Sequence, residues 1–120
     1  MMDYQETRWK VCVQCWTFNH AKYIEETLNG FVLQETTFPY VCCIIDDAST
    51  DGETGIIKRY MQAHFSLSDE SIVRKEDTDD YTLLFAQHKS NKQCFFAALF
   101  LKYNHYSIKK KYIPVYLQLE

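Results

Sequence analysis

The stretch that decides the fold is Tyr40–Ile45, YVCCII, followed directly by Asp46–Gly52, DDASTDG. The first part is apolar without alternation, which is typical of a strand covered on both faces in a parallel sheet. The second part consists of side chains that favour turns and helix caps. We therefore predict a buried strand that ends abruptly in an acidic turn.

Elements of alternating type lie around this strand. Residues 9–16 are rich in β-branched, aromatic and sulfur-containing side chains, and this composition predicts a first strand. Residues 21–34 and 56–65 instead carry apolar side chains at helical spacing, with Asn19 or His20 placed to cap the first of these helices. Strand, helix, strand and helix therefore alternate along the first half.

This alternation predicts an α/β fold with a three-layer, mostly parallel sheet and a Rossmann-like βαβα start. Ligands of such sheets bind beyond the carboxyl ends of the strands. Two polar runs, Thr17–His20 and Asp46–Gly52, follow the first and second predicted strands. We expect the two runs to meet at one rim of the sheet.

The second half has weaker patterns. Ser71–Arg74 is compatible with a short strand, Lys75–Asp80 with a charged loop, and Tyr81–Phe85 with either a continued strand or a turn. The run Asn91–Tyr106 is very apolar, and we predict a helix there.

Length and charge exclude several classes of protein. A chain of 120 residues fits one domain, and its formal charge of −3 offers no basic field for nucleic acid. No apolar stretch reaches the roughly 18 residues that a membrane-spanning helix needs, and the first residues lack the features of a signal peptide. We expect a cytoplasmic protein with no nucleic-acid partner.

The five cysteines are expected to be free thiols, because their number is odd and no secretion signal precedes them. Cys12 and Cys15 have a C-x-x-C spacing, but residues three apart on a strand point to opposite faces. A zinc site is therefore not expected.

The acidic turn allows two interpretations. Neighbouring strand residues point in opposite directions, so one of Asp46 and Asp47 should face the ligand crevice while the other anchors the turn. A carboxylate in the crevice can accept the imide N–H of a uracil-type base or bind a cation. Alternatively, Asp47, Ser49 and Asp51 only cap and shape the turn.

Three segments in order resemble the opening part of family 2 glycosyltransferases of the GT-A fold. They are Thr17–His20 (TFNH), Tyr23–Leu28 (YIEETL) and Ile44–Gly52 (IIDDASTDG). Two motifs occur in order, and each has a strand, a loop and a helix around it. Later, Thr78–Tyr81 and Phe85–Lys89 resemble the bacterial branch of the family, which implies a role in cell-surface polysaccharide.

The resemblance implies that the two polar runs hold the nucleotide of a sugar donor of the UDP type. It places Thr17 and Asn19 beside the base or ribose, with Phe18 in the same loop. It places Asp47 on the edge of the base and leaves Asp46 as the anchor of the turn. The acceptor is not identified.

The resemblance also implies a divalent metal, Mg or Mn, held by an Asp-x-Asp motif after a further apolar strand. Tyr112–Leu117 is not followed by such a motif, and Asp77–Asp79, which spells it, follows charged residues and is interpreted as a solvated loop. We therefore expect residues 1–120 to be the N-terminal, donor-nucleotide-binding part of a longer, truncated enzyme. On this interpretation the chain is inactive alone, with no catalytic or metal-binding residue, and the full-length form is peripheral to the inner membrane.

Two alternatives stay open. The first is a non-catalytic interaction module that forms homo-oligomers through the apolar segment Cys94–Tyr106. The second is a phosphoacceptor domain in which Asp46 or Asp47 takes a phosphoryl group with magnesium. The second alternative needs a lysine at the end of a later strand, and the predicted elements supply none.

Overall fold

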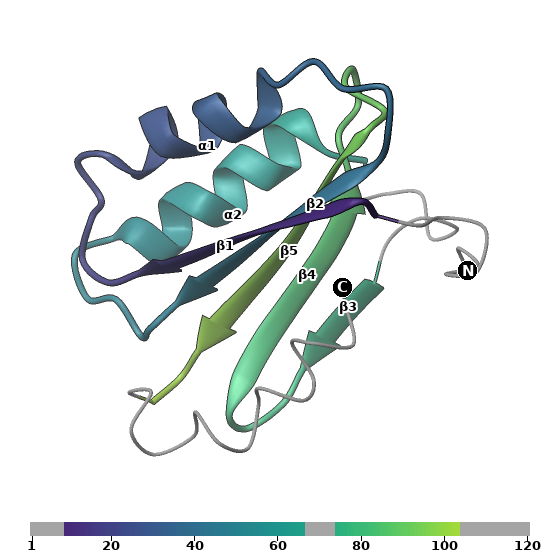
Figure 1. The fold of residues 1–120 in the computed structure, drawn as a ribbon. Coiled ribbons are helices and arrows are strands. Elements are labelled where there is room, and N and C mark those ends of the chain that lie inside the picture. The colour runs from purple at the N-terminus through teal and green to yellow at the C-terminus, as the bar shows by residue number, and fades with distance from the viewer. Residues whose placement is uncertain (1–8, 67–73, 104–120) are drawn as a thin grey trace.

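A computed structural model of the chain describes residues 9–66 and 74–103. The described strands form one five-stranded sheet with the order β1-β2-β5-β4-β3 (Figure 1). The elements are β1 (Val11–Thr17), α1 (Ile24–Val32), β2 (Tyr40–Asp46), α2 (Glu53–His64), β3 (Arg74–Asp77), β4 (Tyr81–Gln87) and β5 (Cys94–Leu101).

The α/β class and the Rossmann-like β-α-β-α start are confirmed. The directions of the strands are more varied than expected. β2 runs parallel to β1 and to β5, whereas β4 is antiparallel to both of its neighbours, β5 and β3. The sheet is therefore mixed, because β4 alone among the described strands runs against the other four.

Both helices cover the same face of the sheet (Figure 1). Leu28 of α1 and Ile57 of α2 belong to one buried cluster with Ile44 of β2. The other face has its own cluster, which includes Val41 of β2 and has Trp9 packed against it. The described residues thus form two layers, where the alternation of elements had predicted three.

The predicted helix over Asn91–Tyr106 is wrong, because Cys94–Leu101 is strand β5. This strand lies between β2 and β4, and every one of its residues is buried. A strand covered on both faces is apolar throughout, so hydrophobic periodicity does not separate it from a buried helix. Residues 104–106 lie outside the described part of the chain.

The edge of the sheet also differs from the prediction. Arg74–Asp77, placed mainly in a charged loop, forms β3, whose described side chains are exposed or half-buried as suits an edge strand. Tyr81–Gln87 forms β4, which confirms the strand alternative for this segment. Ser71–Val73 and Tyr112–Leu117 lie outside the described residues.

Helix α1 begins later than predicted and without a side-chain cap. Its N-cap is Tyr23, and the carbonyl of His20 accepts the N–H groups of Tyr23 and Ile24 at 2.9 Å each. The predicted capping by Asn19 or His20 is wrong for the side chains, because the Asn19 amide bonds to a different loop. The helix therefore begins at Ile24 rather than near Ala21.

All five cysteines lie in the described strands and are free thiols, as expected. Cys12 packs with the cluster on the face opposite the helices and Cys15 with the cluster under the helices. The two side chains of the C-x-x-C segment therefore diverge. None of the described helices is both long enough and apolar enough to span a membrane.

The turn between β4 and β5 lies at the rim where β2 and β5 begin. The Nδ1 atom of His88 accepts the backbone N–H groups of Ser90 at 3.1 Å and Asn91 at 2.9 Å. The Asn91 amide in turn donates to the carbonyls of Val32 at 2.9 Å and Gln34 at 3.1 Å. One imidazole nitrogen therefore holds the turn that ties the end of α1 to the sheet.

We predict that His88 makes stability depend on pH. Burial, and secondly the positive charges of His64 and Lys92, lower the pKa of His88 from its ordinary 6.5. Because the unfolded chain then binds the proton more tightly, the free energy of unfolding should fall as the pH drops below about 6.5. Urea denaturation between pH 7.5 and 5 measures this loss.

The variant His88→Asn keeps an acceptor oxygen for the two N–H groups but does not titrate. It should therefore lose less stability over the same pH range than the parent. Equal losses in the two proteins would show that another group is responsible.

Candidate functional site

The carboxyl ends of β1 and β2 lie side by side at one rim of the sheet (Figure 1). Thr17 and Asp46, the last residues of these strands, are paired in the parallel register. The N–H of Asp47 continues the pairing by donating to the Thr17 carbonyl at 2.9 Å. The chain then leaves the two strands through a first loop, residues 18–23, and a second loop, residues 47–52.

The two loops are hydrogen-bonded to each other. The N–H of Asn19 donates to Ser49 Oγ at 2.9 Å, and the Asn19 side-chain oxygen accepts the N–H of Thr50 at 2.8 Å. The N–H of Ala21 donates to Asp51 Oδ2 at 2.9 Å. The predicted meeting of the two polar runs is confirmed, and the Asn19 and Asp51 side chains hold the loops together.

Three residues of the loops have left-handed backbone conformations, namely Asn19 (φ 54°), Ala48 (φ 57°) and Gly52 (φ 92°). Asparagine and glycine tolerate this region, whereas alanine is strained there. The second loop therefore keeps its shape at Ala48 because the surrounding hydrogen bonds fix it.

The sequence left open whether Asp46 or Asp47 anchors the turn, and in the structure Asp46 does so. Its carboxylate accepts the N–H of Ser49 at 3.1 Å and the hydroxyl of Thr54 on α2. The side chain is only 1% exposed. Asp47, which follows the strand, is half-buried at the start of the second loop.

Glu53, the first residue of α2, is a member of the site that sequence reasoning missed. It is completely buried, and its carboxylate accepts the hydroxyl of Thr17 from β1 and the hydroxyl of Ser49, at 2.6 Å, from the second loop. A glutamate is almost never fully buried unless its carboxylate is paired. The one available signal was the spacing of four residues from Ser49.

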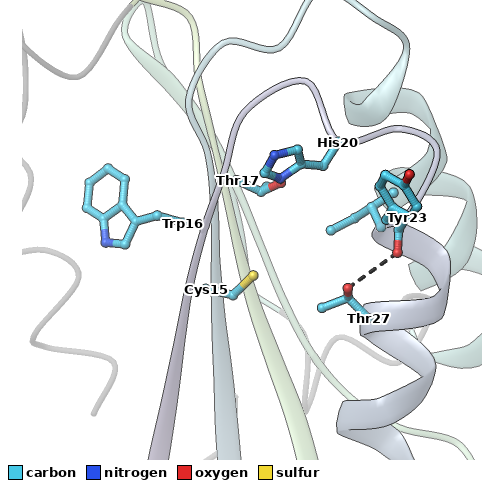
Figure 2. A pocket seen from close by; sticks show the side chains of 7 residues that line it. Cys15, Trp16, Thr17, His20, Tyr23 and Thr27 are labelled. Carbon is cyan, nitrogen blue, oxygen red and sulfur yellow. Dashed lines mark hydrogen bonds between the residues drawn. The ribbon is translucent and has the colours of Figure 1, made fainter.

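A cavity of about 330 Å³ lies beside the first loop, between β1 and α1 (Figure 2). This volume falls at the lower end of the range of small-molecule sites. In Figure 2, the Cys15 side chain points toward α1, while the Trp16 ring points away from the helix. The residues that line the cavity are Cys15, Trp16, Thr17, His20, Tyr23, Ile24 and Thr27.

The thiol in this cavity is protonated at neutral pH. Burial, and secondly the negative charge of Glu53, raise the pKa of Cys15. A protonated thiol is a weak nucleophile and a poor metal ligand. The cavity therefore offers shape and polar contacts rather than a reactive sulfur.

The structure divides the five predicted site residues into two groups. The hydroxyl of Thr17, the amide oxygen of Asn19 and the carboxylate of Asp46 all bind other parts of the loops or α2. Phe18 is 52% exposed at the rim, and Asp47 is half-buried next to Thr17. The first three shape the rim, the Phe18 ring is exposed to solvent, and Asp47 begins the second loop.

The Asp-x-Asp sequence at Asp77–Asp79 does not fit a divalent metal. Asp77 Oδ1 accepts the ammonium of Lys102 at 2.9 Å and the hydroxyl of Thr82 at 2.8 Å. The hydrogen bond from the Lys102 ammonium is the main reason why the pKa of Asp77 is lowered. Within residues 9–66 and 74–103, no three His, Cys, Asp or Glu side chains are grouped as metal ligands.

One sequence-based statement about the phosphoacceptor alternative is wrong. Lys102 directly follows β5, which is a parallel neighbour of β2, so a lysine does stand at a later strand end. Its ammonium, however, bonds to Asp77 and to the Thr78 carbonyl at 2.6 Å. It therefore serves the β3–β4 turn and gives the phosphoacceptor interpretation no support.

Comparison with protein families gives a match that covers both loops. The family described as glycosyl transferase family 2 matches residues 13–80, which is more than half of the chain. The matched region begins in β1 and includes both loops of the rim.

Comparison with curated proteins gives three short matches, each 48% identical over 44 residues. They are uncharacterized proteins, one from Mycobacterium bovis and two from Mycobacterium tuberculosis. The match covers 37% of this chain and only 13% of each relative. No solved structure matches the chain.

We predict that the side-chain oxygen of Asn19 stabilises the rim. Asn19→Ala removes the acceptor of the Thr50 N–H and places alanine in the left-handed region, so it should lower the free energy of unfolding by about 1–3 kcal/mol. Asn19→Asp keeps an acceptor oxygen and should lose clearly less. Urea denaturation of the three proteins checks this order, and an alanine variant as stable as the aspartate variant would contradict it.

Proposed function

The chain belongs to glycosyltransferase family 2, and on this premise we propose that its rim binds the nucleotide of a nucleotide-sugar donor. The observation that carries the proposal is the junction of the first and second loops by three hydrogen bonds, next to a fourth from Asp47 N–H to the carbonyl of Thr17 at the end of β1. Ligands of α/β sheets bind at the carboxyl ends of parallel strands, where this junction lies.

The proposal assigns direct contacts to two side chains. The carboxylate of Asp47 accepts the imide N–H of a uracil-type base, a bond that fixes the edge of the base. The exposed ring of Phe18 stacks on the face of the base. Thr17, Asn19 and Asp46 keep both groups in place through the hydrogen bonds that they make within the protein.

The described residues contribute binding and orientation in this proposal. A divalent metal, Mg or Mn, would supply positive charge for the donor diphosphate during glycosyl transfer. The described part of the chain does not fit that metal, because Asp77 is paired with Lys102. Glycosyl transfer itself is accordingly not assigned to the described residues.

The cellular setting is part of the same proposal. The five free thiols suit a reducing compartment, which supports a cytoplasmic location. The resemblance of Thr78–Tyr81 and Phe85–Lys89 to the bacterial branch supports an acceptor that becomes part of a cell-surface polysaccharide. The bacterial sources of the three matched relatives agree with this setting.

The alternative of a self-associating module loses the feature that motivated it. It required an apolar helix with an exposed aromatic surface, but Phe95, Phe96 and Phe100 lie in β5 and are at most 4% exposed. Their burial in the central strand leaves no aromatic surface there for a second copy of the chain. We therefore propose no homo-oligomer.

We predict weak, saturable binding of UDP that depends on the Asp47 carboxylate. Calorimetric titration of the 120-residue chain should show this binding, and Asp47→Ala should abolish it, because a hydrogen bond to a charged acceptor is lost.

Asp79→Ala is the matched control, because it removes one exposed negative charge from the turn between β3 and β4. It should leave the affinity unchanged. If Asp47→Ala bound UDP as the parent does, the assigned contact with the base would be wrong.

We also predict that Phe18→Ala weakens the binding of UDP by roughly 1 kcal/mol or more, since stacking of a base on an aromatic ring has about this value. Phe18→Tyr keeps the stacking face and should bind like the parent. The ring is 52% exposed, so neither variant should change the melting temperature much. Equal affinities of the alanine and tyrosine variants would count against stacking.

A further inference from the structure

Glu53 combines complete burial with contacts to both halves of the rim. Its two carboxylate oxygens are shared between Thr17, at the end of β1, and Ser49, in the second loop. Burying a carboxylate is costly unless hydrogen bonds compensate for the lost water. Two hydroxyl donors and the positive end of α2 provide that compensation.

The carboxylate also fixes the direction of the hydrogen bonds around it. Both hydroxyls donate to this carboxylate, Thr17 to Oε1 and Ser49 to Oε2, so each uses its single proton on Glu53. Their oxygens are then left as acceptors toward the first loop. Ser49 Oγ accepts the Asn19 N–H at 2.9 Å, and Thr17 Oγ1 lies 3.5 Å from Nδ1 of His20.

The residues that Glu53 holds are neighbours of Phe18 and Asp47, the two side chains assigned to the ligand. Phe18 stands in the chain between Thr17 and Asn19, and both of these are held, directly or through Ser49, by Glu53. Asp47 is tied to Thr17 by its N–H. A shift of the carboxylate therefore moves Phe18 and Asp47 together.

We propose that Glu53 is the positioning residue of the nucleotide site, which sets the distance between Phe18 and Asp47 without touching the nucleotide. The inference rests on the proposed function of the rim. It adds a residue of α2 to a site otherwise built from the first and second loops. The carboxylate acts through Thr17 and Ser49, whose hydroxyls it orients.

The direct test replaces Glu53 by glutamine, which has the same shape but only one acceptor oxygen. One of the two hydroxyls then loses its acceptor, and the loops are held less firmly. UDP affinity, measured by calorimetry at a temperature where both proteins are fully folded, should fall about tenfold.

The control is Asn91→Ala, which breaks a polar network at the opposite rim. Asn91 donates to Val32 and Gln34 and contacts no residue of the two loops in the described hydrogen bonds. This variant should lose stability yet bind UDP within twofold of the parent. A loss of affinity as large as that of Glu53→Gln would show a general effect of destabilisation and overturn the proposal.

A second readout reports on the loops without any nucleotide. In Glu53→Gln, the Asn19 amide should exchange with solvent at least about tenfold faster, while amides of β2 and β5 keep their protection. Should Glu53→Gln fail to fold, Ser49→Ala removes one of the two hydroxyls and must also weaken UDP binding.

The possible failures are separable. A parent chain that does not bind UDP contradicts the proposed function, and the positioning role falls with it. A parent that binds UDP, with a folded Glu53→Gln variant that binds equally well, overturns the positioning role alone. Unchanged exchange of the Asn19 amide in that variant overturns it as well.

Discussion

The parallel pairing of β1 with β2, in which Thr17 stands opposite Asp46, is the constraint on which the rest of the site depends. It makes two segments some 30 residues apart in the chain leave the sheet at the same rim. Once the segments are adjacent, their polar groups can form hydrogen bonds with one another. The buried carboxylate of Glu53 accepts one hydroxyl from each segment. Without this register, the same carboxylate would be an uncompensated buried charge.

Most polar side chains of the rim are occupied by the protein itself. Asn19, Ser49 and Asp51 link the two loops, and Asp46 links the second loop to α2. Such internal bonding fixes the loops before a ligand arrives, so less conformational entropy is lost on binding. The strain of Ala48 at φ 57° fits the same picture of a loop held in one shape. What remains for recognition is a small set of groups on a rigid support.

The sequence allowed the first half of the fold and the meeting of the two loops to be predicted, because the change from strand to helix periodicity is clear and parallel strands share a rim. It failed for β5, whose buried faces leave no periodicity, and it did not indicate that α1 and α2 cover the same face, since nothing in their pattern says which face each covers. The anchoring role of Asp46 was one of two stated possibilities. Glu53 was missed because its burial depends on hydroxyls contributed by β1 and the second loop.

If the first and second loops form a single nucleotide-binding unit, both should respond to UDP at once. A titration of ¹⁵N-labelled protein with UDP, followed by amide chemical shifts, measures this response. We expect the largest shifts to fall together on residues 17–20 and 46–50. Shifts confined to the opposite rim, around residues 32–37 and Asn91, or shifts in only one of the two loops, would contradict it.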